Sequence, residues 1–167
     1  VAVTVSAMRA GATLWSRGLG PLGRGSHSVV WAGATSDGST VTGGPCSLRV
    51  TADGPHGTTT VNQPLTVDLA APRVTAPPVV TVKRPGNARV GLVVRDADSQ
   101  TIKVTATVTD ALGRTVTRST LGWVKQGVSR TWTWRPKARG AYRVIFSARD
   151  RGGNQAPVPA VTRVEVR

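Results

Sequence analysis

Two stretches of this chain of 167 residues carry the same pattern of glycines, tryptophans and strand-forming residues, and this repeat constrains the fold more than any other feature. The pattern that runs from Gly25 to Asp53 returns between Gly127 and Asp150. Corresponding positions lie 102 residues apart early in each copy and 96 apart later, as in Gly11 and Gly113, Gly20 and Gly122, Gly25 and Gly127, Cys46 and Tyr142, and Ala52 and Ala148. The first copy therefore has a longer loop after its tryptophan. Such a repeat predicts two copies of one small fold.

The composition indicates that this fold consists of strands. The chain contains 19 glycines and 11 prolines, and its short runs of Val and Ala lie between these turn formers. No apolar run approaches the ~18 residues of a membrane span, and no signal peptide is recognisable, so we expect no membrane insertion. Because the chain begins at Val1 without a methionine, we expect it to be a processed piece of a longer protein.

The second copy contains seven runs in which apolar and polar residues alternate, a pattern typical of half-buried strands. These runs are Val79 to Lys83, Arg89 to Arg95, Thr101 to Thr109, Arg114 to Leu121, Ser129 to Arg135, Ala141 to Arg149 and Val158 to Val166. Turn residues such as Asp110 and Gly113 separate them. Seven strands of this length predict a small antiparallel sandwich.

The first copy contains only five comparable runs: Ala2 to Ala7, Thr13 to Arg17, Ser26 to Trp31, Pro45 to Asp53 and Thr58 to Val67. The repeat aligns them with the third to seventh strands of the second copy, so the first two strands are missing. Either residues upstream of Val1 supply them, which we favour, or this copy has an exposed sheet edge that something else covers.

A proline-rich segment separates the two copies and sets the domain boundaries. Residues 1–70 form the first domain, 71–78 the linker and 79–167 the second domain. Pro72, Pro77 and Pro78 exclude a helix and a central strand from this segment. We expect a semi-rigid spacer that holds the two domains end to end.

The five tryptophans divide into core and surface candidates. Trp132 and Trp134 lie two residues apart, so they share one face of their strand. The repeat aligns them with Val29 and Trp31, and this recurrence predicts core positions for Trp31, Trp132, Trp134 and, in the strand that follows, Tyr142. Trp15 and Trp123 have no such counterparts. They are therefore the candidates for a ligand-binding surface, where an indole stacks on a sugar ring.

The charge balance favours anionic partners. The chain has 22 basic and eight acidic residues, a net charge of +14, which suits nucleic acid, acidic wall polymers or anionic lipid. The arginines are scattered over nearly every strand and turn, which equally fits a diffusely basic surface. No strand interleaves aromatic residues with clustered Arg and Lys, so we expect no specific nucleic-acid site.

No combination of residues points to catalysis. His27 lies between Ser26 and Ser28, and Asp53 is a conceivable third member of a triad, but neighbouring strand residues face opposite sides of a sheet. No glycine-rich nucleophile elbow is present either. We therefore expect no enzymatic activity.

The sequence also predicts no metal site and no cofactor. Cys46 has no second cysteine to pair with, and we expect a buried thiol. Asp96, Asp98 and the segment from Asp150 to Asn154 offer oxygen atoms to calcium, which takes six to eight ligands. With so few acidic residues in the chain, we interpret these side chains as turn formers.

Several of these residues together resemble a known module. Gly25, Trp31, Gly33, Asp37-Gly38, Gly43-Gly44-Pro45-Cys46 and Val50-Thr-Ala-Asp53 resemble the Ig-like repeat of flagellar hook-capping (FlgD-type) proteins. Ala32 replaces the usual Asp and Cys46 the usual Tyr, which removes the hydrogen bond of the Tyr hydroxyl. In the second copy, the segment from Ala148 to Asn154 is similar to an ending common in bacterial Ig-like and fibronectin-like surface modules.

This resemblance implies an all-β fold of two tandem Ig-like/fibronectin III-like antiparallel β-sandwich domains, the first lacking its N-terminal strands. It also implies a non-catalytic spacer or protein-interaction segment of a secreted or cell-surface bacterial protein, located outside the cell. The alternative is a polysaccharide- or cell-wall-polymer-binding module appended to an extracellular enzyme. The expected partners are other domains of the parent chain and, for a binding role, anionic cell-wall polymers or surface proteins.

Overall fold

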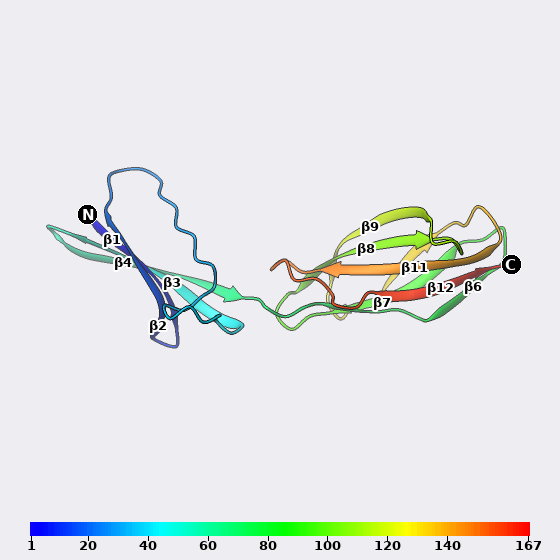
Figure 1. Ribbon diagram of the computed structural model, residues 1–167, viewed down its shortest axis with the longest axis horizontal. Coiled ribbons are helices and arrows are strands. Elements are labelled where there is room, and N and C mark those ends of the chain that lie inside the picture. The colour runs from blue at the N-terminus through cyan, green and yellow to red at the C-terminus, as the bar shows by residue number, and fades with distance from the viewer. The chain divides into compact units, whose positions relative to one another are not determined.

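The computed structural model describes all 167 residues, which divide into two compact units, Val1–Leu69 and Ala70–Arg167. Each unit is built from β-strands and loops (Figure 1). The chain contains no helix that is long and apolar enough to cross a membrane.

Unit 2 is a sandwich of two sheets. Its strands are β5 (Arg73–Thr75), β6 (Val79–Val82), β7 (Ala88–Arg95), β8 (Thr101–Thr109), β9 (Thr115–Lys125), β10 (Arg130–Trp134), β11 (Gly140–Arg149) and β12 (Ala160–Val166). One sheet has the order β10-β7-β5 and the other β6-β12-β11-β8-β9. The core lies between them, because every second residue of β7, β8 and β11 is apolar and buried. All seven runs expected in this copy form strands, with ends that differ by a few residues.

The proline-rich segment belongs to unit 2. We expected residues 71–78 to be a linker, but Arg73–Thr75 pair with Val93–Arg95 of β7 as the edge strand β5. The carbonyl oxygen of Pro77 accepts a hydrogen bond from Thr162 Oγ1 (2.7 Å), and that of Pro78 accepts one from the Arg163 amide (2.8 Å). Proline is tolerated here because the prolines flank an edge strand, where no neighbouring strand needs their missing N–H.

Unit 1 has a single sheet with the order β2-β1-β3-β4, made of β1 (Ala2–Arg9), β2 (Ala12–Pro21), β3 (Gly44–Gly54) and β4 (Gly57–Val67). Four of the five expected runs form these strands. The expectation for Ser26 to Trp31 was wrong, because these residues lie in the long loop between β2 and β3 (Figure 1). Their counterpart β10 pairs with β7, and unit 1 contains no counterpart of β7 with which a strand here can pair.

The pairing register shows that the two units repeat one structure. The β1–β2 hairpin has irregularities at Val3/Thr4 and Ala7/Met8, and the β8–β9 hairpin has them at Val104/Thr105 and Val108/Thr109, each 101 residues later. Gly20 and Gly122, which lie opposite the first of these bulges, both have positive φ angles, 70° and 76°. Only glycine adopts this conformation readily, which explains why these glycines recur in the sequence.

Candidate interaction surfaces

The aromatic residues of β10 and β11 form part of the core of unit 2. Trp132 is buried, stacks on Trp134 at 6.4 Å between ring centroids and meets Phe146 edge-on at 5.8 Å. Tyr142 is buried and packs edge-on against half-buried Trp134. The polar atoms are satisfied: Trp132 Nε1 donates to Ser119 Oγ (2.9 Å) and Tyr142 Oη donates to the carbonyl oxygen of residue 138 (3.1 Å). Trp132 and Tyr142 therefore belong to the core of unit 2, and Trp134 packs against that core.

Trp31 and Trp15 lie together in unit 1, although the repeat predicted a core position for Trp31 and a surface position for Trp15. Their ring centroids are 6.3 Å apart, and both side chains are half-buried. Trp31 Nε1 donates to the carbonyl oxygen of Ala34 (2.7 Å), which ties the ring to the tight turn that follows. A hollow of about 410 Å³ lies beside the pair and the turn. The contact joins the loop after β2 to β2 itself, which is an edge strand of the sheet.

The turn beside these tryptophans is held by Asp37. Its carboxylate accepts hydrogen bonds from the Thr35 hydroxyl and from the amide of Ser39 (3.0 Å). The bond from Thr35 is the main cause that lowers the pKa of Asp37 below its ordinary value, and the bonds from Ser39 add to it. Asp37 is thus a turn residue that stays ionised.

Trp123 lies on the solvent face of unit 2 within a row of cations. Its side chain is 45% exposed, and the guanidinium carbon of Arg151 lies 4.5 Å from the ring centroid. Lys103 is the cross-strand partner of both Trp123 and Arg149, so these three side chains leave the sheet on the same face. Arg151 Nε also donates to Thr101 Oγ1 (3.0 Å), which fixes the guanidinium over the indole. We call Trp123, Lys103, Arg149 and Arg151 the Trp123 patch.

The charge of the chain is concentrated in the unit that carries this patch. Residues 70–167 contain 18 of the 22 basic and five of the eight acidic residues, so unit 2 carries +13 of the net charge of +14. The ion pairs of the chain join Arg114 to Asp110, and Arg163 and Arg167 to Glu165. Lys103, Arg149 and Arg151 take part in none of them. Like charges opposite each other on neighbouring strands are unfavourable, and a bound anion would relieve this repulsion.

A second surface is apolar and lies in unit 1. A groove of about 500 Å³ opens between the sheet and the loop that follows β2. Arg24 and His27 contribute polar side chains to its lining. The rest of the lining consists mainly of Val and Leu side chains: Val1, Val3, Val5, Leu19, Leu22, Val29, Leu48 and Val50. Val50 and Val61, which pair across β3 and β4, remain exposed on this sheet.

The residues considered for catalysis bond elsewhere. His27 Nε2 is hydrogen-bonded to the carbonyl oxygen of Gly23 (3.0 Å), and Asp53 Oδ1 accepts a hydrogen bond from Thr58 Oγ1 (2.5 Å). Buried Cys46 lies 3.1 Å from Nη2 of Arg9, whose guanidinium also binds the Thr42 carbonyl oxygen (2.6 Å). Thr42 and Ala138 are 96 residues apart, like Cys46 and Tyr142, so Arg9 donates to the carbonyl oxygen that corresponds to the acceptor of the Tyr142 hydroxyl in the other copy.

The acidic side chains considered as calcium ligands close turns. Asp96 Oδ1 accepts hydrogen bonds from the amides of Asp98 (2.9 Å) and Ser99 (2.8 Å). Asp150 is buried and accepts hydrogen bonds from the amide (2.8 Å) and the side chain (2.9 Å) of Asn154. The bonding of both carboxylates is that of Asx turns.

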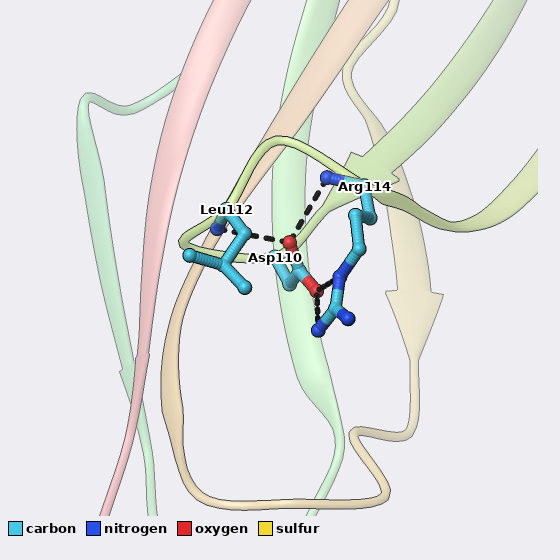
Figure 2. A network of polar contacts seen from close by, with 3 residues as sticks. All are labelled: Asp110, Leu112 and Arg114. Atoms are coloured by element: carbon cyan, nitrogen blue, oxygen red, sulfur yellow. Dashed lines mark hydrogen bonds and ion pairs between the residues drawn. The ribbon is translucent and has the colours of Figure 1, made fainter.

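Asp110 organises the turn between β8 and β9 (Figure 2). Its Oδ1 accepts hydrogen bonds from the amides of Leu112 and Arg114, both at 2.9 Å. Its Oδ2 accepts a hydrogen bond from Nε of Arg114 (2.8 Å) and forms an ion pair with Nη2 of the same residue (2.7 Å). The side-chain hydrogen bond from Arg114 is the main cause that lowers the pKa of Asp110. The aspartate at this position thus stabilises the hairpin that the sequence predicted.

The comparisons with known proteins place the fold. No protein-family model and no curated protein matches the chain. Among solved structures, a tetra-tandem repeat in the extending region of a large adhesion protein matches with a TM-score of 0.50 and 20% identity. The match covers 98% of this chain but only 41% of that one. The PKD domain of an M14-like peptidase from Thermoplasmatales archaeon SCGC AB-540-F20 matches with a TM-score of 0.42 and 18% identity, over 59% of this chain and 97% of that domain. The chain has the all-β fold of tandem Ig-like repeats, as expected from the sequence, with two sheets in unit 2 and a single sheet in unit 1.

Sequence reasoning found Trp123 but missed the cations around it. Lys103 is 20 residues and Arg149 is 26 residues from Trp123 in the chain, and only the pairing of β8 with β9 and β11 brings them together. The sequence does show that apolar and polar residues alternate in β8, β9 and β11, and this alternation indicates which side chains share a face of the sheet. The bulge at Val104/Thr105 shifts the register, so alternation alone does not give the correct partner.

Proposed function

We propose that this chain is a non-catalytic spacer that extends a larger protein along its length and carries mechanical load. The observation that supports this proposal is that the chain enters each unit at one end of its sheet and leaves at the other. In unit 1, Ala2 pairs with Asp53 at one end of β3, and Val67 pairs with Gly44 at the other end. Each unit therefore separates the point where the chain enters from the point where it leaves by about the length of its own sheet.

In unit 2 the chain also enters at one end of the sheets and leaves at the other. Arg73 of β5 pairs with Arg95, which a short loop joins to β8 at the end of the sandwich where Lys103 pairs with Arg149. The last strand finishes at the opposite end, where Val166 pairs with Gly140. With 10 to 11 residues in the long central strands, each unit contributes roughly 35 Å.

The strand β6 and the last strand of unit 2, β12, are arranged to resist force. β6 and β12 are parallel neighbours, paired from Val79 and Arg163 to Val82 and Val166. Pulling the two ends of the unit apart drives these strands in opposite directions along their axes. The hydrogen bonds between them are then loaded together rather than one after another, and this shear geometry opposes unfolding.

The structural likeness supports the same role. The repeats that match almost the whole chain come from the extending region of a large adhesion protein, and extension is what the two units provide here. We also propose that the units are divergent FlgD-type Ig-like repeats of a secreted or cell-surface bacterial protein. The Gly, Trp and Asp-Gly positions of the first copy quoted above support this assignment.

Stretching single molecules between the two termini tests the spacer function. We expect two unfolding events that release roughly 210 Å for the 69 residues of unit 1 and roughly 320 Å for the 98 residues of unit 2. In the control, unit 2 is pulled from Arg167 and from a handle at Arg139→Cys in a Cys46→Ser background. Both points lie at the same end, so the strands peel apart, and we expect a lower force. Equal forces in the two geometries would contradict the proposal.

A second candidate function is binding of an anionic polysaccharide or wall polymer at the Trp123 patch. The observation that favours it is the exposed indole with Arg151 over its ring and with Lys103 and Arg149, which lack acidic partners, in the same row. Indole faces stack on sugar rings, and the cations suit carboxylate, sulfate or phosphate groups.

Tryptophan fluorescence measured during titration with polygalacturonate tests this second function, with neutral dextran as the control polymer. We expect binding to be lost in Trp123→Ala and kept in Trp15→Ala, whose indole lies in the other unit. Equal binding by both variants, or binding abolished by moderate salt, would indicate nonspecific charge attraction instead.

A further inference from the structure

Unit 1 pairs its four strands in the same order as β9, β8, β11 and β12 of unit 2, but the two units differ in how well the inner face of this sheet is covered. In unit 2, β8 and β11 turn these residues inward, and all are buried: Ile102, Val104, Ala106, Val108, Val144, Phe146 and Ala148. The shared register gives their counterparts in unit 1 as Val1, Val3, Val5, Ala7, Leu48, Val50 and Ala52. Val1 is 58% exposed where Ile102 is 0% exposed, and Val50 is 37% exposed where Phe146 is 0% exposed. An element that covers this face in unit 2 is therefore missing from unit 1.

The element that covers the face in unit 2 includes β7. Its inward side chains Val90, Leu92 and Val94 are at most 1% exposed and belong to the same core as Phe146. β7 pairs with β10 on one side and with β5 on the other. Without β7, the apolar side chains of β8 and β11 would face water.

Unit 1 retains the counterpart of β10 as an unpaired segment. Val29 and Trp31 correspond to Trp132 and Trp134, and the pattern of exposure is also the same. Val29 and Trp31 are half-buried, whereas Val30 between them is 82% exposed. Yet no backbone group of residues 24–32 forms a hydrogen bond with another backbone group. This segment is oriented like a strand and lacks a neighbouring strand.

We infer that the apolar groove of unit 1 binds a strand equivalent to β7 of unit 2, and that the segment of the polypeptide that precedes β1 supplies this strand. In unit 2, β7 directly precedes β8, and residues 96–100 connect them. The same connection leads to β1 in unit 1, because Val1 corresponds to Ile102. The strand pairs antiparallel with residues 28–32 and places its apolar side chains on Val3, Val5 and Val50.

The pairing in unit 2 also specifies the chemistry of this strand. Trp132 lies opposite Val90, and Trp134 lies opposite Ala88. The incoming strand therefore carries an apolar residue opposite Val29 and a small residue opposite Trp31, where a bulky side chain would collide with the indole. Between these positions its side chains face water and are free to be polar.

Grafting the connection of unit 2 onto unit 1 tests this inference. Residues 86–101 are added directly before Val1 of the full chain, which restores the register of Ile102 at Val1. We expect amide hydrogen exchange at alternate positions among residues 28–32 to slow at least tenfold relative to the chain without the graft. A matched graft whose copies of Val90, Leu92 and Val94 are replaced by Thr keeps the length and charge, and we expect it to give no protection.

Three results would overturn the inference. The first is unchanged exchange at residues 28–32 in the grafted chain. The second is equal protection by the Thr-substituted graft, because the apolar side chains would then play no part. The third is a chain of 167 residues that dimerises in light scattering and protects these amides as its concentration rises, because a second copy would then occupy the groove.

Discussion

Replacing Phe146 with Ala tests the packing that holds unit 2 together. The ring is fully buried, meets Trp132 edge-on at 5.8 Å and lies between the two sheets. Removing such a ring costs about 3–5 kcal/mol, because the lost burial is followed by a cavity that rigid sheets fill poorly. A domain of this size has a stability of about 5–15 kcal/mol. We therefore expect the free energy of unfolding of unit 2 to fall by about 3–5 kcal/mol in Phe146→Ala, which is a large share of its total stability.

The matched control is Val50→Ala, at the corresponding position of unit 1. Val50 is 37% exposed, so removing its two methyl groups costs only about 1 kcal/mol at ~0.8 kcal/mol for each fully buried group. Urea unfolding followed by NMR signals from each unit separates the two effects. A loss of less than about 1.5 kcal/mol in Phe146→Ala would refute the reasoning, since it lies well below the range for a buried ring. So would a larger loss in Val50→Ala than in Phe146→Ala.

Two further changes test polar contacts of unit 2. Arg114→Ala removes the main cause of the lowered pKa of Asp110, so we expect an NMR titration to show this pKa rising toward 3.8. Because the pKa of Asp110 is lower in the folded protein than in the unfolded chain, the ionised carboxylate stabilises the fold above the ordinary pKa. This contribution is lost as the pH falls through the lowered pKa, and Arg114→Ala should lack most of it at every pH. An unchanged pKa of Asp110 in Arg114→Ala would contradict the assignment. Tyr142→Phe removes the hydrogen bond to the Ala138 carbonyl oxygen, and we expect the free energy of unfolding of unit 2 in urea to fall by about 0.5–1.5 kcal/mol. An unchanged stability would contradict this role of the hydroxyl.

Local alternation was enough to predict most strands. The runs that became β8 and β11 alternate apolar and polar residues, and in both the apolar set faces the core. The run from Ser26 to Trp31 alternates in the same way but forms no strand, because a strand requires a neighbour for its hydrogen bonds. Alternation predicts which side of a segment is covered, and it does not predict whether a partner strand is present.

The candidate surfaces were less accessible to sequence reasoning. Trp123 stood out because it has no counterpart in the first copy, but its neighbours Lys103 and Arg149 come from two other strands. Trp15 and Trp31 were assigned to different classes and lie in contact. Contacts of this kind depend on register, which the bulges change by one residue and which no local pattern records.

The sequence by itself determined that this protein is all-β, that it contains two copies of one fold, and that glycines hold equivalent turns and bulges in both. These properties follow from local preferences and from the repeat. Only the tertiary structure decided that the proline-rich segment belongs to unit 2 and that unit 1 leaves an apolar groove open. The same was true of the cations that gather around Trp123. The physical reason is that strand pairing and burial depend on residues far apart in the chain. Both copies have the same local pattern, but β7 covers the apolar face of the sheet in unit 2 and no strand covers it in unit 1.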